Sequence, residues 1–215
     1  MTDFEPVSES IVVEKQLRYY LLGAVDTTEI DEIVFAFHGY GQLAYYFSKK
    51  FEVNSDTKRL FVFPEGMHRF YLNGTTGRVG ASWMTKELRE NDISENNLAL
   101  NRLYESLKER FSWKKMSVIG FSQGGATASR WLNSSKIDCD CYISWASVFP
   151  PDLSQTDFSQ TIRKKLFVLG TEDQYFKDEN FEKAIEFYRN FKFEIVTYSG
   201  NHSIEPEVLN TILEK

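Results

Sequence analysis

The nine-residue stretch VIGFSQGGA, Val118–Ala126, decides the fold of this chain. It contains the pattern G-x-S-x-G from Gly120 to Gly124, with an apolar, β-branched run before it and helix-compatible residues after it. Between a strand and a helix, small flanking residues let the backbone turn sharply and hold the central hydroxyl out at the end of a sheet. The pattern predicts that Ser122 is a nucleophile, although a tight structural turn would use the same glycines.

Short apolar runs and helical stripes alternate along the rest of the chain. Continuous apolar runs are typical of strands in a parallel sheet, and apolar residues spaced three or four apart are typical of helices packed on it. The expected strands are Ile33–Phe37, Leu60–Phe63, Met116–Gly120, Cys141–Trp145, Leu166–Gly170 and Phe193–Tyr198. The expected helices carry the stripes Leu100–Phe111, Phe181–Tyr188 and Val208–Leu213. The alternation predicts an α/β fold with a mostly parallel central sheet, helices on both faces, and a ligand site at the carboxyl ends of the strands.

Three further segments carry local signals. Asp92, with Glu95 three residues on, predicts the start of the long helix. The β-branched and aromatic residues of Ile11–Leu22, within an N-terminal extension over residues 1–30, predict an edge hairpin. Met67–Thr85 is rich in glycine and aromatic residues without a clean period, so it reads as a long irregular segment of functional interest.

Composition limits the class of protein and its partners. The 215 residues suffice for one domain, 1–215, and the roughly twenty residues between Trp145 and Leu166 leave no room for a large lid domain. A net charge of −6 without a basic block argues against nucleic acid and anionic membranes as partners. No apolar run approaches the ~20 residues that span a bilayer, and the N-terminus lacks a signal-peptide pattern. We therefore expect a cytoplasmic protein whose two cysteines, Cys139 and Cys141, are reduced thiols near the core.

A nucleophilic serine needs a base and an acid that orients it. The sequence holds 3 histidines, and only His202 follows Ser122, in the chain order that this strand–turn–helix motif requires. His202 comes directly after the last expected strand, so we interpret it as the general base rather than an incidental loop histidine. The preceding strand is followed by Glu172 and Asp173, of which Asp173 is favoured because it lies further into the loop.

The oxyanion of the reaction needs two preorganised N–H donors. One is expected from the backbone of Gln123, directly after the nucleophile, and the other from Tyr40 in the glycine-containing loop that follows the Ile33–Phe37 strand. His38 begins that loop and is interpreted as a structural brace, not as a base.

These motifs resemble the phospholipase/carboxylesterase family of α/β-hydrolases, which includes the acyl-protein thioesterases. The matching features are His38-Gly39-x-Gly41, Gly120-Phe121-Ser122-Gln123-Gly124-Gly125, Gly170-x-x-Asp173 and Gly200-x-His202. The resemblance implies a single-domain α/β-hydrolase fold, hydrolysis of carboxylic esters or thioesters, the triad of Ser122, Asp173 and His202, and no metal or cofactor. The sequence departs from the better-known thioesterases at Gln42, where they usually carry Asp, and at Met84-Thr85, where they tend to have Phe-Asp.

Aromatic side chains are the candidates for the walls of the substrate cleft, which we expect to be open or shallow. The predicted wall residues are Trp83, Phe70, Tyr71, Phe149 and Tyr175. Arg69 and Arg78 are candidates for binding an anionic group, against the alternative that they are solvated loop arginines. We predict a serine esterase acting on a small-molecule ester or thioester, with a homodimer left open. The alternatives are a lactone hydrolase or peptidase with the same triad, and a binding protein without catalysis.

Overall fold

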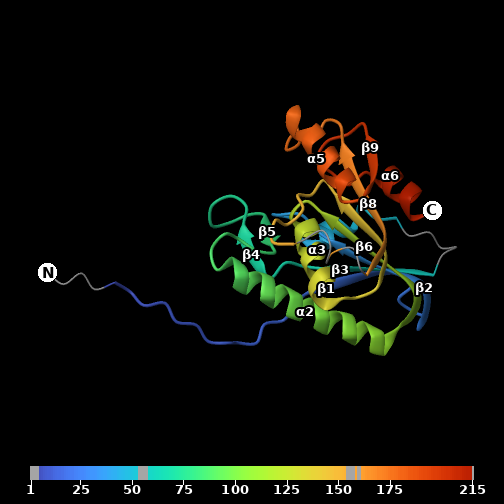
Figure 1. Ribbon diagram of the computed structural model, residues 1–215. Coiled ribbons are helices and arrows are strands. Elements are labelled where there is room, and N and C mark those ends of the chain that lie inside the picture. The colour runs from blue at the N-terminus through green and yellow to red at the C-terminus, as the bar shows by residue number, and fades with distance from the viewer. Residues whose placement is uncertain (1–4, 53–57, 154–157, 159–160, 215) are drawn as a thin grey trace.

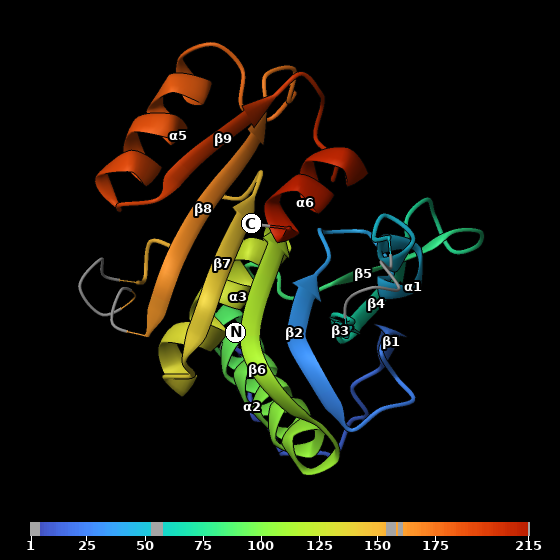
Figure 2. The ribbon, with the colours of Figure 1, turned by 90° about the vertical axis from the view of Figure 1, so that its right-hand side faces the viewer.

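The computed structural model describes residues 5–52, 58–153, 158 and 161–214. Its centre is a seven-stranded sheet in the order β1-β3-β2-β6-β7-β8-β9, whose central strands lie side by side across Figure 2. The strands are β1 (Tyr19–Gly23), β2 (Glu29–Phe37), β3 (Arg59–Pro64), β6 (Ser112–Phe121), β7 (Cys139–Trp145), β8 (Ile162–Gly170) and β9 (Glu194–Tyr198). All neighbouring pairs are parallel except β1 with β3. The prediction of a mostly parallel sheet is confirmed, and so are the six predicted strands.

Helices cover both faces of the sheet. They are α1 (Ala44–Ser48), α2 (Arg89–Arg110), α3 (Gln123–Ser135), α5 (Glu179–Asn190) and α6 (Pro206–Leu213). Figure 2 shows α2 and α3 behind the sheet and α6 in front of it. The three predicted apolar stripes fall in α2, α5 and α6, as expected for helices that bury one face against a sheet. The segment from β7 to β8 is too short for a lid domain, as the sequence predicted.

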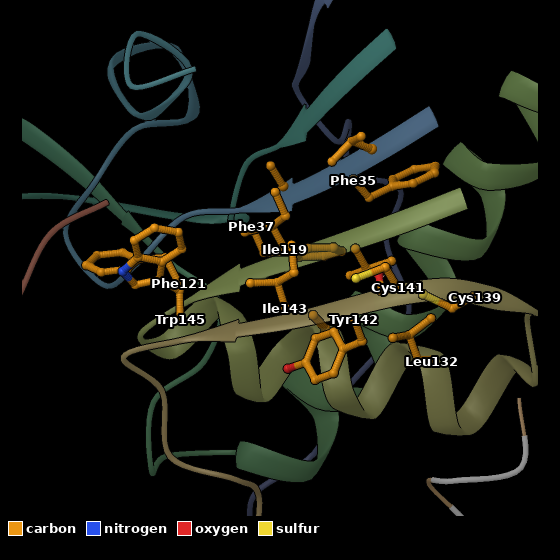
Figure 3. Packing of buried hydrophobic residues seen from close by; sticks show 14 of the residues in the cluster. Phe35, Phe37, Ile119, Phe121, Leu132, Cys139, Cys141, Tyr142, Ile143 and Trp145 are labelled. Carbon is orange, nitrogen blue, oxygen red and sulfur yellow. Dashed lines mark hydrogen bonds between the residues drawn. The ribbon is translucent and has the colours of Figure 1, made fainter. Parts of the chain in front are cut away.

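The core lies between these layers, and side chains of the central strands fill it (Figure 3). Phe35 and Phe37 of β2 point to one face, where their rings lie 5.1 and 5.7 Å from the ring of Trp131 in α3. Phe121 of β6 packs on the other face against Phe47 of α1, with ring centroids 6.2 Å apart. Each fully buried side chain of this kind contributes about 1.5–3 kcal/mol. The continuous apolar runs are therefore explained by burial on both faces.

The strand ends are aligned at one edge of the sheet. Phe37 of β2 lies opposite Gly120 of β6, and Phe121 lies opposite Trp145 of β7. Further along the same edge, Gly170, the last residue of β8, lies opposite Tyr198 of β9. Because these strands are parallel, the loops that follow them emerge together, at the edge of the sheet where the sequence predicts a ligand site.

The long helix does not begin as predicted. Arg89–Arg110 has Leu88 at its cap position, in a left-handed conformation with φ 49° and without a side-chain cap bond. Asp92 lies in the first turn instead and accepts the Thr85 N–H at 3.2 Å. Its other oxygen lies 3.1 Å from Nε2 of His68. The prediction of a cap at Asp92 is wrong because this carboxylate binds segments outside the helix.

Two segments differ from their predicted conformation. The Met67–Thr85 segment is not irregular throughout, since β4 (His68–Tyr71) and β5 (Val79–Ser82) pair antiparallel within it, at the left of Figure 1. The edge hairpin predicted for Ile11–Leu22 is wrong: β1 alone takes the edge of the sheet, and residues 5–18 form neither strand nor helix. Val12 in that stretch is fully exposed because no second strand lies beside it. Within the described residues, no helix is long and apolar enough to cross a membrane.

Candidate active site

The turn after β6 holds Ser122 in a strained conformation. Ser122 has φ 52° and ψ −122°, a region that residues with a side chain rarely adopt. Two backbone hydrogen bonds fix it, from Ser122 N–H to the carbonyl of Trp145 at 2.9 Å and from Gly125 N–H to the carbonyl of Ser122 at 3.0 Å. The strain is thus held by the strand beside it and by the first turn of α3.

The glycines of this turn are required by close packing. A Cβ at Gly120 would lie 2.4 Å from Cα of Gly125, and one at Gly124 would lie 2.4 Å from the carbonyl oxygen of Phe37. Neither distance is tolerated by real side chains, so β6, β2 and α3 meet here only through bare backbone. The motif therefore brings Ser122 and the start of the loop after β2 together.

His202 and Asp173 form a close pair. Nδ1 of His202 lies 2.6 Å from Oδ2 of Asp173, whose side chain is fully buried. The other carboxylate oxygen accepts the backbone N–H of Tyr175 at 2.9 Å. A carboxylate accepts, so Nδ1 carries the proton and Nε2 is left with its lone pair, the tautomer that a general base needs. Glu172, the alternative, instead accepts the hydroxyl of Ser199 at 2.8 Å and is exposed.

The imidazole of His202 lies beside the nucleophile turn. Its ring centroid is 4.8 Å from that of Phe121, the residue before Ser122, and 4.6 Å from that of Tyr175, which meets it edge-on. The loop that carries it is tied down at Ser203, whose carbonyl accepts Nε1–H of Trp145 at 3.0 Å and the hydroxyl of Tyr198 at 2.6 Å. Aromatic contacts and hydrogen bonds therefore fix both the position and the orientation of this ring.

The loop after β2 approaches Ser122 closely. A Cβ at Gly39 would lie 3.2 Å from Cβ of Ser122. Among the described residues, the backbone N–H groups of Tyr40 and Gln123 have no hydrogen-bond partner, whereas Gly39 donates to the side chain of Gln42 at 2.9 Å and Gly41 donates to the carbonyl of Ala81 at 2.9 Å. Stabilisation of a developing oxyanion requires two such unpaired donors close to the serine.

The side chain of Gln123 has a role that the sequence did not indicate. Its Oε1 accepts the N–H of Trp83 at 3.1 Å and the hydroxyl of Ser82 at 3.2 Å, while its Nε2 donates to the carbonyl of Met84 at 2.8 Å. These bonds tie the first residue of α3 to the end of β5. Because the side chain is held in this way, the backbone N–H of Gln123 is also held in a fixed orientation.

The other two histidines have different partners. His38 is completely buried, its Nε2 accepts the N–H of Gly66 at 2.9 Å, and its Nδ1 donates to the carbonyl of Gly39 at 2.8 Å. Burial lowers the pKa of His38 to about 4, which keeps the ring neutral. Its interpretation as a brace is confirmed. His68 lies against Asp92 at the start of α2.

The predicted wall residues fall into two groups. Trp83 and Phe149 are buried: Trp83 donates from Nε1 to the carbonyl of His38 at 2.9 Å, and Phe149 packs on rings of α5. Phe70 is half-buried and lies 5.1 Å from the ring of Tyr40. The remaining two, on the hairpin and beside the base, are exposed: Tyr71 and Tyr175.

The two cysteines lie in the core, away from solvent. Cys139 and Cys141 are free and buried, and burial raises the pKa of Cys141 to about 11, which keeps this thiol protonated. Among the same residues, no group of three or more His, Cys, Asp or Glu side chains is arranged to hold a metal ion.

Comparison with known proteins agrees with this geometry. The fold is shared with solved structures of an esterase and a thioesterase. The chain matches the FSH1 serine hydrolase family over residues 30–208, and it belongs to that family. No curated protein sequence matched the chain.

Three solved structures illustrate the shared fold. Esterase PE8 matches with a TM-score of 0.65 at 16% identity, over 93% of this chain and 99% of that one. Acyl-protein thioesterase 2 from Zea mays matches at 0.63 and 16% identity, over 92% and 96%. SOBER1 from Arabidopsis thaliana matches at 0.60 and 18% identity, over 86% and 96%. The resemblance drawn from the sequence motifs is therefore confirmed at the level of fold and hydrolase class.

Proposed function

We propose that this serine hydrolase cleaves carboxylic ester or thioester bonds with Ser122 as nucleophile, His202 as general base and Asp173 as the acid that orients it. The observation that carries the proposal is the 2.6 Å contact between Nδ1 of His202 and Oδ2 of Asp173, beside the strained turn that presents Ser122. A buried carboxylate on Nδ1 fixes the tautomer and stabilises the imidazolium that forms during the reaction.

The reaction proceeds in two halves. The hydroxyl oxygen of Ser122 attacks the carbonyl carbon while Nε2 of His202 takes the hydroxyl proton, and the negative charge on the carbonyl oxygen is bound by the N–H groups of Tyr40 and Gln123. His202 then gives the proton to the departing alcohol or thiol, which leaves an acyl group on Ser122. A water molecule attacks that ester in the same way, and His202 returns the proton to the serine oxygen.

The surroundings of the site favour exposed or short esters as substrates. Tyr40 is 60% exposed and carries one expected oxyanion donor, while Tyr175 is 66% exposed and lies against the base. Because the base hands its proton to the leaving group, Tyr175 lies on the leaving-group side. The ring of Phe70 packs at a tilt against that of Tyr40 and adds to the aromatic surface there. Such a surface binds acyl or aryl groups from the outside, without a deep tunnel.

Labelling with a fluorophosphonate probe tests the proposal, followed by hydrolysis of nitrophenyl esters from acetate to palmitate and of a thioester, a lactone and an aminoacyl amide. We expect Ser122→Ala to abolish labelling and to lower kcat by several orders of magnitude without unfolding. Ser10→Ala, on the exposed N-terminal segment, is the control. Labelling that persists in Ser122→Ala would reject the assignment.

The adjacent carboxylates provide a matched pair for the same assay. Asp173→Asn should lower kcat by about 10⁴-fold, because an amide holds the wrong tautomer of His202. Glu172→Gln should leave kcat within about twofold, since Glu172 contacts Ser199 and not the base. Equal effects of the two substitutions would remove Asp173 from the mechanism.

A further inference from the structure

Glu65 is a completely buried carboxylate that the proposed reaction does not use. It follows β3, and its side chain has no solvent exposure. Its Oε1 accepts Nε–H and Nη2–H of Arg18 at 3.0 and 2.6 Å, and Nε–H of Arg69 at 2.8 Å. Its Oε2 accepts the backbone N–H of Ala44 at 3.1 Å. A buried charge is stable only when paired and hydrogen-bonded in this way, so the site has been built around Glu65.

Glu65 and its neighbour hold both ends of the oxyanion loop, residues 38–44. The N–H of Gly66 donates to Nε2 of His38 at the beginning of the loop. The carboxylate of Glu65 accepts the N–H of Ala44 at its end. Tyr40, the expected oxyanion donor, lies between these two fixed points. Two consecutive residues of one turn therefore set the span of the loop that faces Ser122.

Arg18 connects the N-terminal segment to Glu65 and Gly66, which together form a clamp on this loop. Its carbonyl accepts the N–H of Glu65 at 2.9 Å, and its guanidinium, 44% exposed, binds the carboxylate. Arg18 directly precedes β1, the antiparallel edge strand that pairs with β3. Arg69, a candidate for binding an anionic substrate, instead completes the clamp from β4. The charge that balances Glu65 thus comes from two segments outside the parallel sheet.

We propose that Glu65 is a positioning residue for the oxyanion loop and that Arg18 helps to hold the Glu65 carboxylate in place. This inference rests on the proposed function. An oxyanion donor acts only within about 2.7–3.1 Å of the oxygen that it stabilises. A small shift of Tyr40 therefore weakens binding of the transition state more than binding of the ester itself, so kcat changes and KM does not.

Steady-state kinetics and hydrogen exchange test the clamp. In Glu65→Gln, which keeps the shape but removes the charge, kcat should fall about 10- to 100-fold while KM stays within about threefold. Arg18→Gln should also lower kcat, but by a smaller factor than Glu65→Gln. Arg18→Lys should retain most of the wild-type kcat. Arg163→Gln, which removes a 77% exposed partner of Asp140, is the control and should change nothing. The amide of Ala44 should exchange faster in Glu65→Gln and in Arg18→Gln.

The outcomes separate the clamp from the proposed function. An unchanged kcat in Glu65→Gln with faster exchange at Ala44 would overturn the positioning role. A kcat that falls only in proportion to the unfolded fraction in thermal melts of both Glu65→Gln and Arg18→Gln would overturn it as well. If the wild-type protein hydrolysed no ester and bound no fluorophosphonate, the proposed function would fail first. In that case, hydrogen exchange at Ala44 alone would test whether Glu65 holds the loop.

Discussion

The nucleophile turn and the oxyanion loop face each other but are built differently. The turn at Ser122 is specified by a contiguous motif, in which Gly120 and Gly124 pack directly against backbone atoms. The loop around Tyr40 is held by residues from distant parts of the chain: Glu65 and Gly66 after β3, and Ala81 in β5. One half of the site is local in sequence, and the other is assembled by the fold.

This difference has consequences for mutation. A change within the turn should affect stability and catalysis together, because strand, turn and helix share the same few atoms. A change in the supports of the loop should act mainly on the geometry of one N–H group, at Tyr40. Gly120→Ala, the pH dependence that His38 confers, and Gln123→Met test that contrast.

Gly120→Ala should have the largest effect. The new Cβ would lie 2.4 Å from Cα of Gly125, so β6 or α3 must move. We expect the free energy of unfolding to fall by several kcal/mol, because overpacking ordinarily costs about 1–3 kcal/mol and can cost more. Fluorophosphonate labelling should be lost as well. Urea unfolding and labelling measure the two effects on the same sample.

Gly74→Ala is the matched control for that substitution. Gly74 has φ 66° but nothing within 4 Å of an added Cβ. It should lose only about 1–2 kcal/mol to backbone strain and keep full activity. If Gly120→Ala behaved like Gly74→Ala, the close packing of the turn would not be what holds Ser122.

Burial of neutral His38 on the loop side should make the stability of the folded protein decline as the pH falls. Burial lowers the pKa of His38 in the folded protein from 6.5 to about 4. Between these values the unfolded chain binds a proton that the folded protein does not. The stabilisation is therefore complete above pH 6.5 and declines as the pH falls toward 4, by up to about 3 kcal/mol.

Urea unfolding at several pH values between 4.5 and 7.5 measures that decline. His38→Gln is the reference, because an amide can accept the N–H of Gly66 and donate to the carbonyl of Gly39 without titrating. The wild-type protein should lose more stability than this variant over the same range. Parallel pH profiles of the two proteins would show that His38 is not the group that titrates.

The same contrast explains how much could be predicted from the sequence. The six buried strands and the apolar helix stripes were predictable because burial on one or two faces leaves a periodic pattern. The β4–β5 hairpin was not, since glycines and half-exposed aromatics hide its alternation. The edge hairpin over Ile11–Leu22 was predicted from β-branched residues, although propensity cannot say whether a partner strand exists.

The candidate site follows the same division. Ser122, His202 and Asp173 each follow a recognisable strand, so chain order alone nominated them, and the structure brings His202 and Asp173 together. The burial of Trp83 and Phe149 could not be predicted, because an aromatic side chain has the same sequence signature in a core as in a cleft. Glu65 was missed, because a buried carboxylate cannot be told from an exposed one until its partners are known.

Gln123→Met should have the smallest effect. It tests the side-chain hydrogen bonds that connect the start of α3 with the end of β5. Methionine fills the same volume but loses the bonds to Trp83, Ser82 and Met84, while the backbone N–H remains. We expect kcat to fall about tenfold with KM little changed, equivalent to roughly 1.4 kcal/mol of transition-state stabilisation. Ser82→Ala removes one of these bonds and should lower kcat less. If Gln123→Met instead matched Gly120→Ala in lost stability, the two halves would be one mechanical unit, and the contrast between local and assembled parts would be wrong.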